Sequence, residues 1–177
     1  MLHYYLVSGE EDFERMSNEY NAAFDDEDVL HGLIHHSLEF KRGYVERDEF
    51  DQGPRNVFNY GHSFGHAIES LTHYEVPHGI AISFGMDIAD LISVKRGYIT
   101  PELRMRMQKL LKKNWGEVRL STVNVDDLIA ALRMDKKAVG SEIQVILTKG
   151  LGEMFKTPLE INEDVKGWLR ECLESYA

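Results

Sequence analysis

The sequence predicts a mainly α-helical domain that contains one small β-hairpin. Most of the chain has apolar residues at spacings of three and four, which is the period of an amphipathic helix. One stretch differs: in residues 142–156, the apolar runs IQVIL and MFK flank the turn sequence KGLGE and indicate two short antiparallel strands. The length of 177 residues, without a linker-like segment, predicts a single domain over residues 1–177.

Six helices account for the apolar periodicity. They are expected at Asp25–Arg42, Asn59–Leu71, Gly79–Lys95, Glu102–Lys113, Asp126–Met134 and Asp164–Tyr176. In the first, Leu30, Leu33 and Ile34 follow an acidic first turn that suits the positive end of the helix dipole. In the fourth, Thr100 is the expected cap and Pro101 the first-turn residue. No GxGxxG sequence follows a strand, so we expect no dinucleotide-binding fold in this chain.

Composition excludes several classes of function. The chain carries 30 acidic and 20 basic residues, a formal net charge of −10, which argues against binding to nucleic acid. No apolar stretch approaches the ~18 residues of a membrane-spanning helix, and the N-terminal sequence turns acidic before a signal peptide could form. We therefore expect a cytoplasmic protein without a membrane partner. Cys172 is the single cysteine, so a metal site would use mainly His and carboxylate ligands.

A histidine-rich segment over residues 59–79, NYGHSFGHAIESLTHYEVPHG, is the strongest functional signal. His62 and His66 are four apart and share one face of a helix, where Gly61 and Gly65 allow a neighbour to approach closely. His78 begins the next helix after the chain turns back, so a third nitrogen can reach the same pocket. Imidazole is a common ligand of zinc and similar ions. The alternative is a set of packed or surface histidines, which is also how we interpret the histidines of Asp25–Arg42.

Several cations and one amide accompany the histidines. Lys41, Arg55 and Asn59 precede the His pair, and Lys136 and Lys137 occur in the later sequence RMDKKAVG. Arg offers a planar fork to a carboxylate or phosphate and Lys a point charge, so these residues are candidate anion ligands. The alternative is a solvated surface on which the cations pair with neighbouring acidic residues.

Three ordered blocks resemble a known family. KRGYVERDEFDQGPRNVFNYGHSFGHAIES, HGIAISFGMDIA and RMDKKAVG resemble the C-terminal metal-binding domain of dehydroquinate synthases and of the wider sugar-phosphate cyclases. The resemblance implies a helical fold with a small hairpin and a divalent metal, zinc being expected, held by His62 and His78. It implies that His66 contacts the substrate and handles a proton. The substrate-binding residues that it implies are Lys41, Arg55, Asn59 and Lys137.

The resemblance also implies an NAD-assisted reaction on a sugar phosphate: oxidation of a hydroxyl, loss of phosphate, re-reduction and ring closure. A third metal ligand of the family, a Glu, would fall just before Met1, and His3 aligns with a family Lys. The NAD-binding domain is absent from this chain, so we expect NAD to be bound by a missing N-terminal half or a separately encoded partner, and the isolated chain to be inactive. Ile80 and Ile82 replace family residues in the HGEAV block, which leaves room for a substrate other than that of dehydroquinate synthase.

Two other functions remain open at this point. A metal-dependent alcohol dehydrogenase-like domain would also use a His-rich helix, but a simple alcohol offers no anionic group for three cations. A non-catalytic helical assembly module would retain the pocket without the reaction. Apolar helix faces left by an absent partner domain also make a homo-oligomer possible, which light scattering would test.

Overall fold

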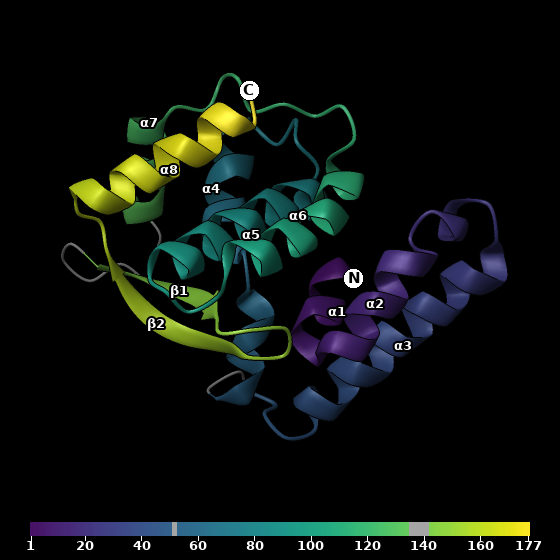
Figure 1. Cartoon of the computed structure of the whole chain (residues 1–177). Coiled ribbons are helices and arrows are strands. Elements are labelled where there is room, and N and C mark those ends of the chain that lie inside the picture. The colour runs from purple at the N-terminus through teal and green to yellow at the C-terminus, as the bar shows by residue number, and fades with distance from the viewer. Residues whose placement is uncertain (51–52, 135–141) are drawn as a thin grey trace.

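The computed structural model describes residues 1–50, 53–134 and 142–177, and the described part is helical with one antiparallel hairpin (Figure 1). The fold class expected from the sequence is confirmed. The elements are α1 (Leu2–Ser8), α2 (Glu10–Glu19), the 3-10 turn η1 (Ala22–Phe24), α3 (Glu27–Val45), the 3-10 turn η2 (Pro54–Asn59), α4 (His62–Leu71), α5 (His78–Lys95), α6 (Pro101–Trp115), α7 (Val125–Met134), β1 (Glu142–Thr148), β2 (Met154–Glu160) and α8 (Glu163–Ser175).

The expected helices agree with α3 to α8 except at their ends. Helix α4 begins at His62 and not at Asn59, because Gly61 has a φ of 78° and separates the helix from η2. The expected cap of α6 is confirmed, since the Thr100 side chain accepts a hydrogen bond from the Leu103 backbone N–H at 3.3 Å. The side chain of Asp26 caps α3 by accepting from the backbone of Asp28 and Val29.

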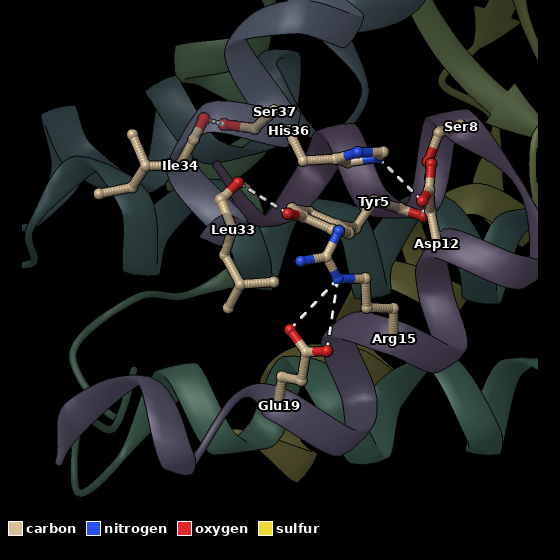
Figure 2. Close-up of polar contacts among 9 residues, drawn as sticks. All are labelled: Tyr5, Ser8, Asp12, Arg15, Glu19, Leu33, Ile34, His36 and Ser37. Atoms are coloured by element: carbon tan, nitrogen blue, oxygen red, sulfur yellow. Dashed lines mark hydrogen bonds and ion pairs between the residues drawn. The ribbon is translucent and has the colours of Figure 1, made fainter. Parts of the chain in front are cut away.

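Helices α1 and α2 lie outside the helices expected from the sequence. They meet at Gly9, whose φ of 126° favours glycine and ends one helix as the next begins. Figure 2 shows how polar contacts join them to α3: Tyr5 donates a hydrogen bond to the Leu33 carbonyl at 2.7 Å, and His36 lies 2.8 Å from the Asp12 carboxylate. These contacts place His36 at an internal interface between α3 and the two N-terminal helices.

Helix α5 is the centre of the core. It packs against α4, α6, α8 and β1, and Figure 1 shows it enclosed by these elements. Its buried residues include Asp87, whose Oδ2 accepts hydrogen bonds from Arg104 and Gln108 of α6, each at 2.9 Å, and from Tyr176 at 2.5 Å. The carboxylate therefore ties the central helix to α6 and to the residue that follows α8.

Glycines set the distance between α4 and α5. A Cβ on Gly65 would lie 2.8 Å from the Cα of Ile82, and a Cβ on Gly85 would lie 2.7 Å from the backbone nitrogen of Gly65. Neither space admits a side chain, so the two helix backbones are in direct contact. The close approach expected beside Gly61 and Gly65 is confirmed, and the neighbour is α5.

The hairpin pairs β1 with β2 in antiparallel register, from Glu142 opposite Glu160 to Thr148 opposite Met154. It is attached to α4 by a hydrogen bond from the Ser63 hydroxyl to the Gln144 carbonyl at 3.0 Å. Among the described residues, no helix has the length and apolar character needed to cross a membrane.

Candidate metal and substrate site

Three imidazoles converge where α4 meets the start of α5. His62 and His66 lie one turn apart on α4, and His78 is the first residue of α5. The ring centroids are 5.4 Å apart for His62 and His66, and 5.7 Å apart for each of the other two pairs. One potential ligand atom from each residue lies within 4.8 Å of the other two. The structure thus brings together the three histidines that the sequence singled out.

Two of the three rings have a hydrogen-bond acceptor at Nδ1. His78 Nδ1 lies 3.0 Å from Oε2 of Glu69, and His62 Nδ1 lies 3.2 Å from the Tyr60 carbonyl oxygen. A metal-ligating histidine usually donates its second ring N–H in this way, which leaves the other nitrogen for the metal. For His66, no ring hydrogen bond occurs within the described ranges. The pattern separates His62 and His78 from His66.

The spacing of these donors suits a divalent cation held by two or three of them. Nitrogens bound to zinc at about 2.0 to 2.1 Å in a tetrahedral site lie about 3.4 Å apart. In the structure, the potential ligand atoms lie within 4.8 Å of one another, which is a wider limit than this spacing. Small side-chain movements would therefore bring them into range of one ion. His78 is largely exposed, with 58% of its side chain accessible, which leaves room for that movement and for a further ligand.

A cavity of about 370 Å³ opens beside the cluster. His62 and His78 line it together with His3 of α1, and most of the other lining residues are apolar. The His3 ring is 5.6 Å from that of His62. Burial, together with nearby positive groups that include the N-terminal ammonium and Lys41, lowers the pKa of His3 from 6.5 to about 3. Lys41 therefore lies within electrostatic range of His3.

His66 faces a different hollow. It lines a second cavity of about 460 Å³ between α4 and α7, together with residues such as Ser63, Asp127 and Met134. The histidine cluster is thus accessible from two sides, with His62 and His78 on the apolar side and His66 on the more polar one.

The remaining expected site residues make no hydrogen bond or ion pair with the cluster among the described residues. Arg55 lies in η2, and its guanidinium donates to the Glu49 carbonyl at 3.0 Å. Asn59 ends η2, two residues before the glycine that precedes His62. Lys137, with Lys136, lies outside the described residues. Within the described part of the chain, neither Arg55 nor Asn59 forms a hydrogen bond or ion pair with the cluster.

Two contributors to the site were missed by the sequence reasoning: Glu69 and the Tyr60 carbonyl. Glu69 follows His62 by seven residues and His66 by three, so helical spacing places all three on one face of α4. That signal was present in the sequence. The Tyr60 carbonyl depends on the backbone conformation around Gly61 and has no sequence signal.

Residues 1–138 match the family model described as 3-dehydroquinate synthase C-terminal. The chain belongs to this family. The resemblance seen in the three sequence blocks is confirmed. This C-terminal domain is 35% identical over 148 residues to a 3-dehydroquinate synthase of Alkaliphilus metalliredigens, covering 81% of this chain and 42% of the relative. It is 34% identical over 171 residues to a 3-dehydroquinate synthase of Prochlorococcus marinus, covering 94% of this chain and 46% of the relative.

The 3-dehydroquinate synthase C-terminal domain therefore spans less than half the length of these curated relatives. Its fold is also that of two solved structures. A 2-deoxy-scyllo-inosose synthase complexed with carbaglucose-6-phosphate, NAD+ and Co2+ matches with a TM-score of 0.72 and 23% identity, covering 85% of this chain and 42% of that one. ValA, a 2-epi-5-epi-valiolone synthase from Streptomyces hygroscopicus with NAD+ and Zn2+ bound, matches with a TM-score of 0.78 and 16% identity, covering 98% of this chain and 50% of that one.

Proposed function

We propose that this chain is the metal- and substrate-binding domain of a sugar-phosphate cyclase of the 3-dehydroquinate synthase type. The observation that carries the proposal is the convergence of His62, His66 and His78, in which the two ligands implied by the family, His62 and His78, have acceptors behind Nδ1. The single core around α5 supports one domain over residues 1–177.

His62 and His78 would hold a divalent metal, and the all-nitrogen donor set favours zinc or a similar ion. When bound, the metal supplies Lewis-acid polarisation of a substrate hydroxyl and the ketone formed from it. The residues' own contribution is to fix the position of that oxygen. Because both rings stand on the helices that meet at Gly65 and Gly85, their separation is set by backbone contact.

His66 would take and return a proton at its free ring nitrogen. It stands within 4.8 Å of the nitrogens of the two proposed ligands but lacks their hydrogen-bonded orientation among the described residues. Lys41 would neutralise a carboxylate or phosphate near His3. Arg55 would bind the substrate with Asn59 after its guanidinium leaves the Glu49 carbonyl, and Lys137 would be a further anion ligand.

NAD would be bound outside the residues of this chain, by an N-terminal half like that of the longer relatives or by a separate partner. Support comes from the relatives, of which this chain covers about 40%, and from the two solved cyclases, both of which hold NAD+. The described sheet has two antiparallel strands and is not a dinucleotide-binding sheet. The chain alone would therefore be inactive, and the substrate would be a sugar phosphate.

Calorimetric titration of Zn2+ into the chain tests the metal site. The variants His62→Ala and His78→Ala are expected to lose high-affinity binding of one ion, and His66→Ala to retain it. The matched control is His35→Ala, which removes an exposed histidine of α3. Equal zinc affinity in His62→Ala, His78→Ala and the unmodified chain would refute the site.

An activity assay tests the reaction. Adding the NAD-binding half of a relative to the chain should give phosphate release from a sugar phosphate, and His66→Ala should abolish that release.

A further inference from the structure

We propose that Glu69 is a positioning residue that fixes the tautomer and ring orientation of His78, a role that rests on the proposed function of His78 as a metal ligand. The Glu69 side chain is 11% exposed, and its Oε2 lies 3.0 Å from His78 Nδ1. With a proton on Nδ1, the ring donates to the carboxylate and presents the Nε2 lone pair on its opposite side. Nε2 is then the atom open to a cation.

The fold holds Glu69 for this contact through its backbone as well. The Glu69 carbonyl accepts a hydrogen bond from the Tyr74 backbone N–H at 2.8 Å and one from the Thr72 hydroxyl at 3.3 Å. These bonds close the turn that carries the chain from α4 back to His78. His73 and Tyr74 have φ values of 51° and 62°, an unusual conformation for residues other than glycine. One residue therefore anchors both the turn and the ring at its end.

The burial of the Glu69 carboxylate does not by itself stabilise the fold. Within the described ranges, its carboxylate forms a hydrogen bond or ion pair with His78 alone. A nearly buried carboxylate without an Arg or Lys partner costs free energy that an apolar residue at this position would avoid. A carboxylate behind a ligating imidazole, in contrast, strengthens the imidazole as a metal donor and fixes its direction. We therefore assign the contact to the orientation of His78 and not to the stability of the core.

The acceptors that face Nδ1 differ between the two proposed ligands. His62 donates to a neutral backbone carbonyl, whereas His78 faces a carboxylate. Hydrogen bonds to a charged acceptor are stronger than those between neutral groups. The proposal therefore predicts that metal affinity depends on the charge of Glu69 as well as on its ability to accept a hydrogen bond.

Substitutions at two acidic positions separate these contributions. Glu69→Ala removes the acceptor and should lower Co2+ affinity about 10- to 100-fold. Glu69→Gln keeps the shape and an accepting oxygen but loses the charge, so its loss should be smaller and its fold intact. The matched control is Glu75→Gln, with Glu75→Ala beside it, because Glu75 is an exposed carboxylate in the turn before His78. Both control variants should bind Co2+ as the unmodified chain does.

Two measurements on the complete chain decide the matter. Long-range nitrogen–proton NMR of the metal-free chain reports the His78 tautomer, and Co2+ titration followed by the visible absorption of the bound ion reports affinity. The proposal expects a proton on His78 Nδ1 in the unmodified chain and in Glu69→Gln, and a shift toward the other tautomer in Glu69→Ala. A proton on Nε2 in the unmodified chain would overturn it.

The outcomes also separate this proposal from the proposed function. If His62→Ala and His78→Ala lose Co2+ while Glu69→Ala and Glu69→Gln bind it within twofold of the unmodified chain, the metal site stands and the role of Glu69 is refuted. If His62→Ala and His78→Ala bind Co2+ unchanged, the metal site is refuted, and the role of Glu69 toward a metal is refuted with it. Lowered affinity in both Glu69 variants, with Glu75 variants unchanged, supports both.

Discussion

Arg104 and Asp87 form an ion pair in the interior, with Nη2 and Oδ2 2.9 Å apart. The Asp87 side chain is fully buried, and that of Arg104 is 19% exposed. Burial alone lowers the pKa of Arg104, but the Asp87 charge and hydrogen bond outweigh it, so the net shift of the pKa is upward. The guanidinium therefore remains charged within the core, and it fixes α6 against the helix that begins with His78.

Replacing Arg104 should destabilise the protein. Arg104→Met leaves the Asp87 carboxylate buried without its cation, and loss of one partner of a buried pair costs about 3 to 5 kcal/mol. Gln108 and Tyr176 still donate to the carboxylate, so we expect the lower end of that range. Urea denaturation measures the loss. The control is Arg106→Met on the same helix: Arg106 pairs with Glu10 and Glu14 on the surface, and its loss should cost less than about 1 kcal/mol.

Gly85→Ala should disrupt the contact between α4 and α5. The added methyl group would meet the backbone of Gly65, which cannot move as a side chain could, so we expect a loss of about 3 kcal/mol in the free energy of unfolding. Because the histidines stand on these two helices, zinc affinity should fall as well. Gly79→Ala is the control, since a Cβ at Gly79 would have nothing within 4 Å and alanine favours the helix. Equal stability of the two variants in urea would contradict the prediction.

His73→Gly should stabilise the protein. His73 has a φ of 51° just after α4, where glycine is the favoured residue and a side chain costs about 1 kcal/mol. His73 is exposed and outside the histidine cluster, so zinc binding should not change. Ser70→Gly, an exposed position inside α4, should have the opposite sign and cost up to about 1 kcal/mol. Thermal and urea denaturation of both variants measure the two effects.

Stability should fall in alkaline solution because of Cys172. Burial, followed by the Asp87 charge, raises the pKa of this thiol from 9.0 to about 12. Between these values the unfolded chain loses the proton and the folded chain keeps it, so the free energy of unfolding falls as pH rises, by up to about 1.4 kcal/mol per pH unit from this group. Cys172→Ala should show a shallower decline from about pH 9 to about pH 10, in reducing urea titrations. An identical slope in both proteins would exclude the thiol as the cause.

Periodicity and end signals were sufficient for most of the fold. The apolar spacing located α3 to α8, and Thr100 with Pro101 marked the start of α6 correctly. The short helices α1 and α2 were not expected, although Phe13 and Met16 of α2 are buried and three residues apart. Helix α1 has seven residues, too few to show a helical period, and its separation from the ten-residue α2 depends on the positive φ of Gly9. The local sequence does not specify α1 and α2 by itself, and packing against α3 stabilises them as helices.

Part of the candidate site could likewise be predicted from the sequence, and part could not. The spacing of His62 and His66 and the return of the chain at His78 were sufficient to bring three rings together. The contact between Glu69 and His78 depends on a turn formed by non-glycine residues at positive φ, which no local pattern specifies. The direction of Arg55 toward the Glu49 carbonyl was equally inaccessible, because a surface guanidinium has many acceptors within reach.

The two cavities divide the histidines, because His62 and His78 line one of them and His66, the proposed proton carrier, lines the other. A small compound with an apolar body and a metal-seeking head group could fill the space beside His3 and reach His62 and His78 while leaving His66 untouched. Such a probe would compete for the ion without mimicking a sugar. Its selectivity would come from the apolar residues that line the cavity beside His3.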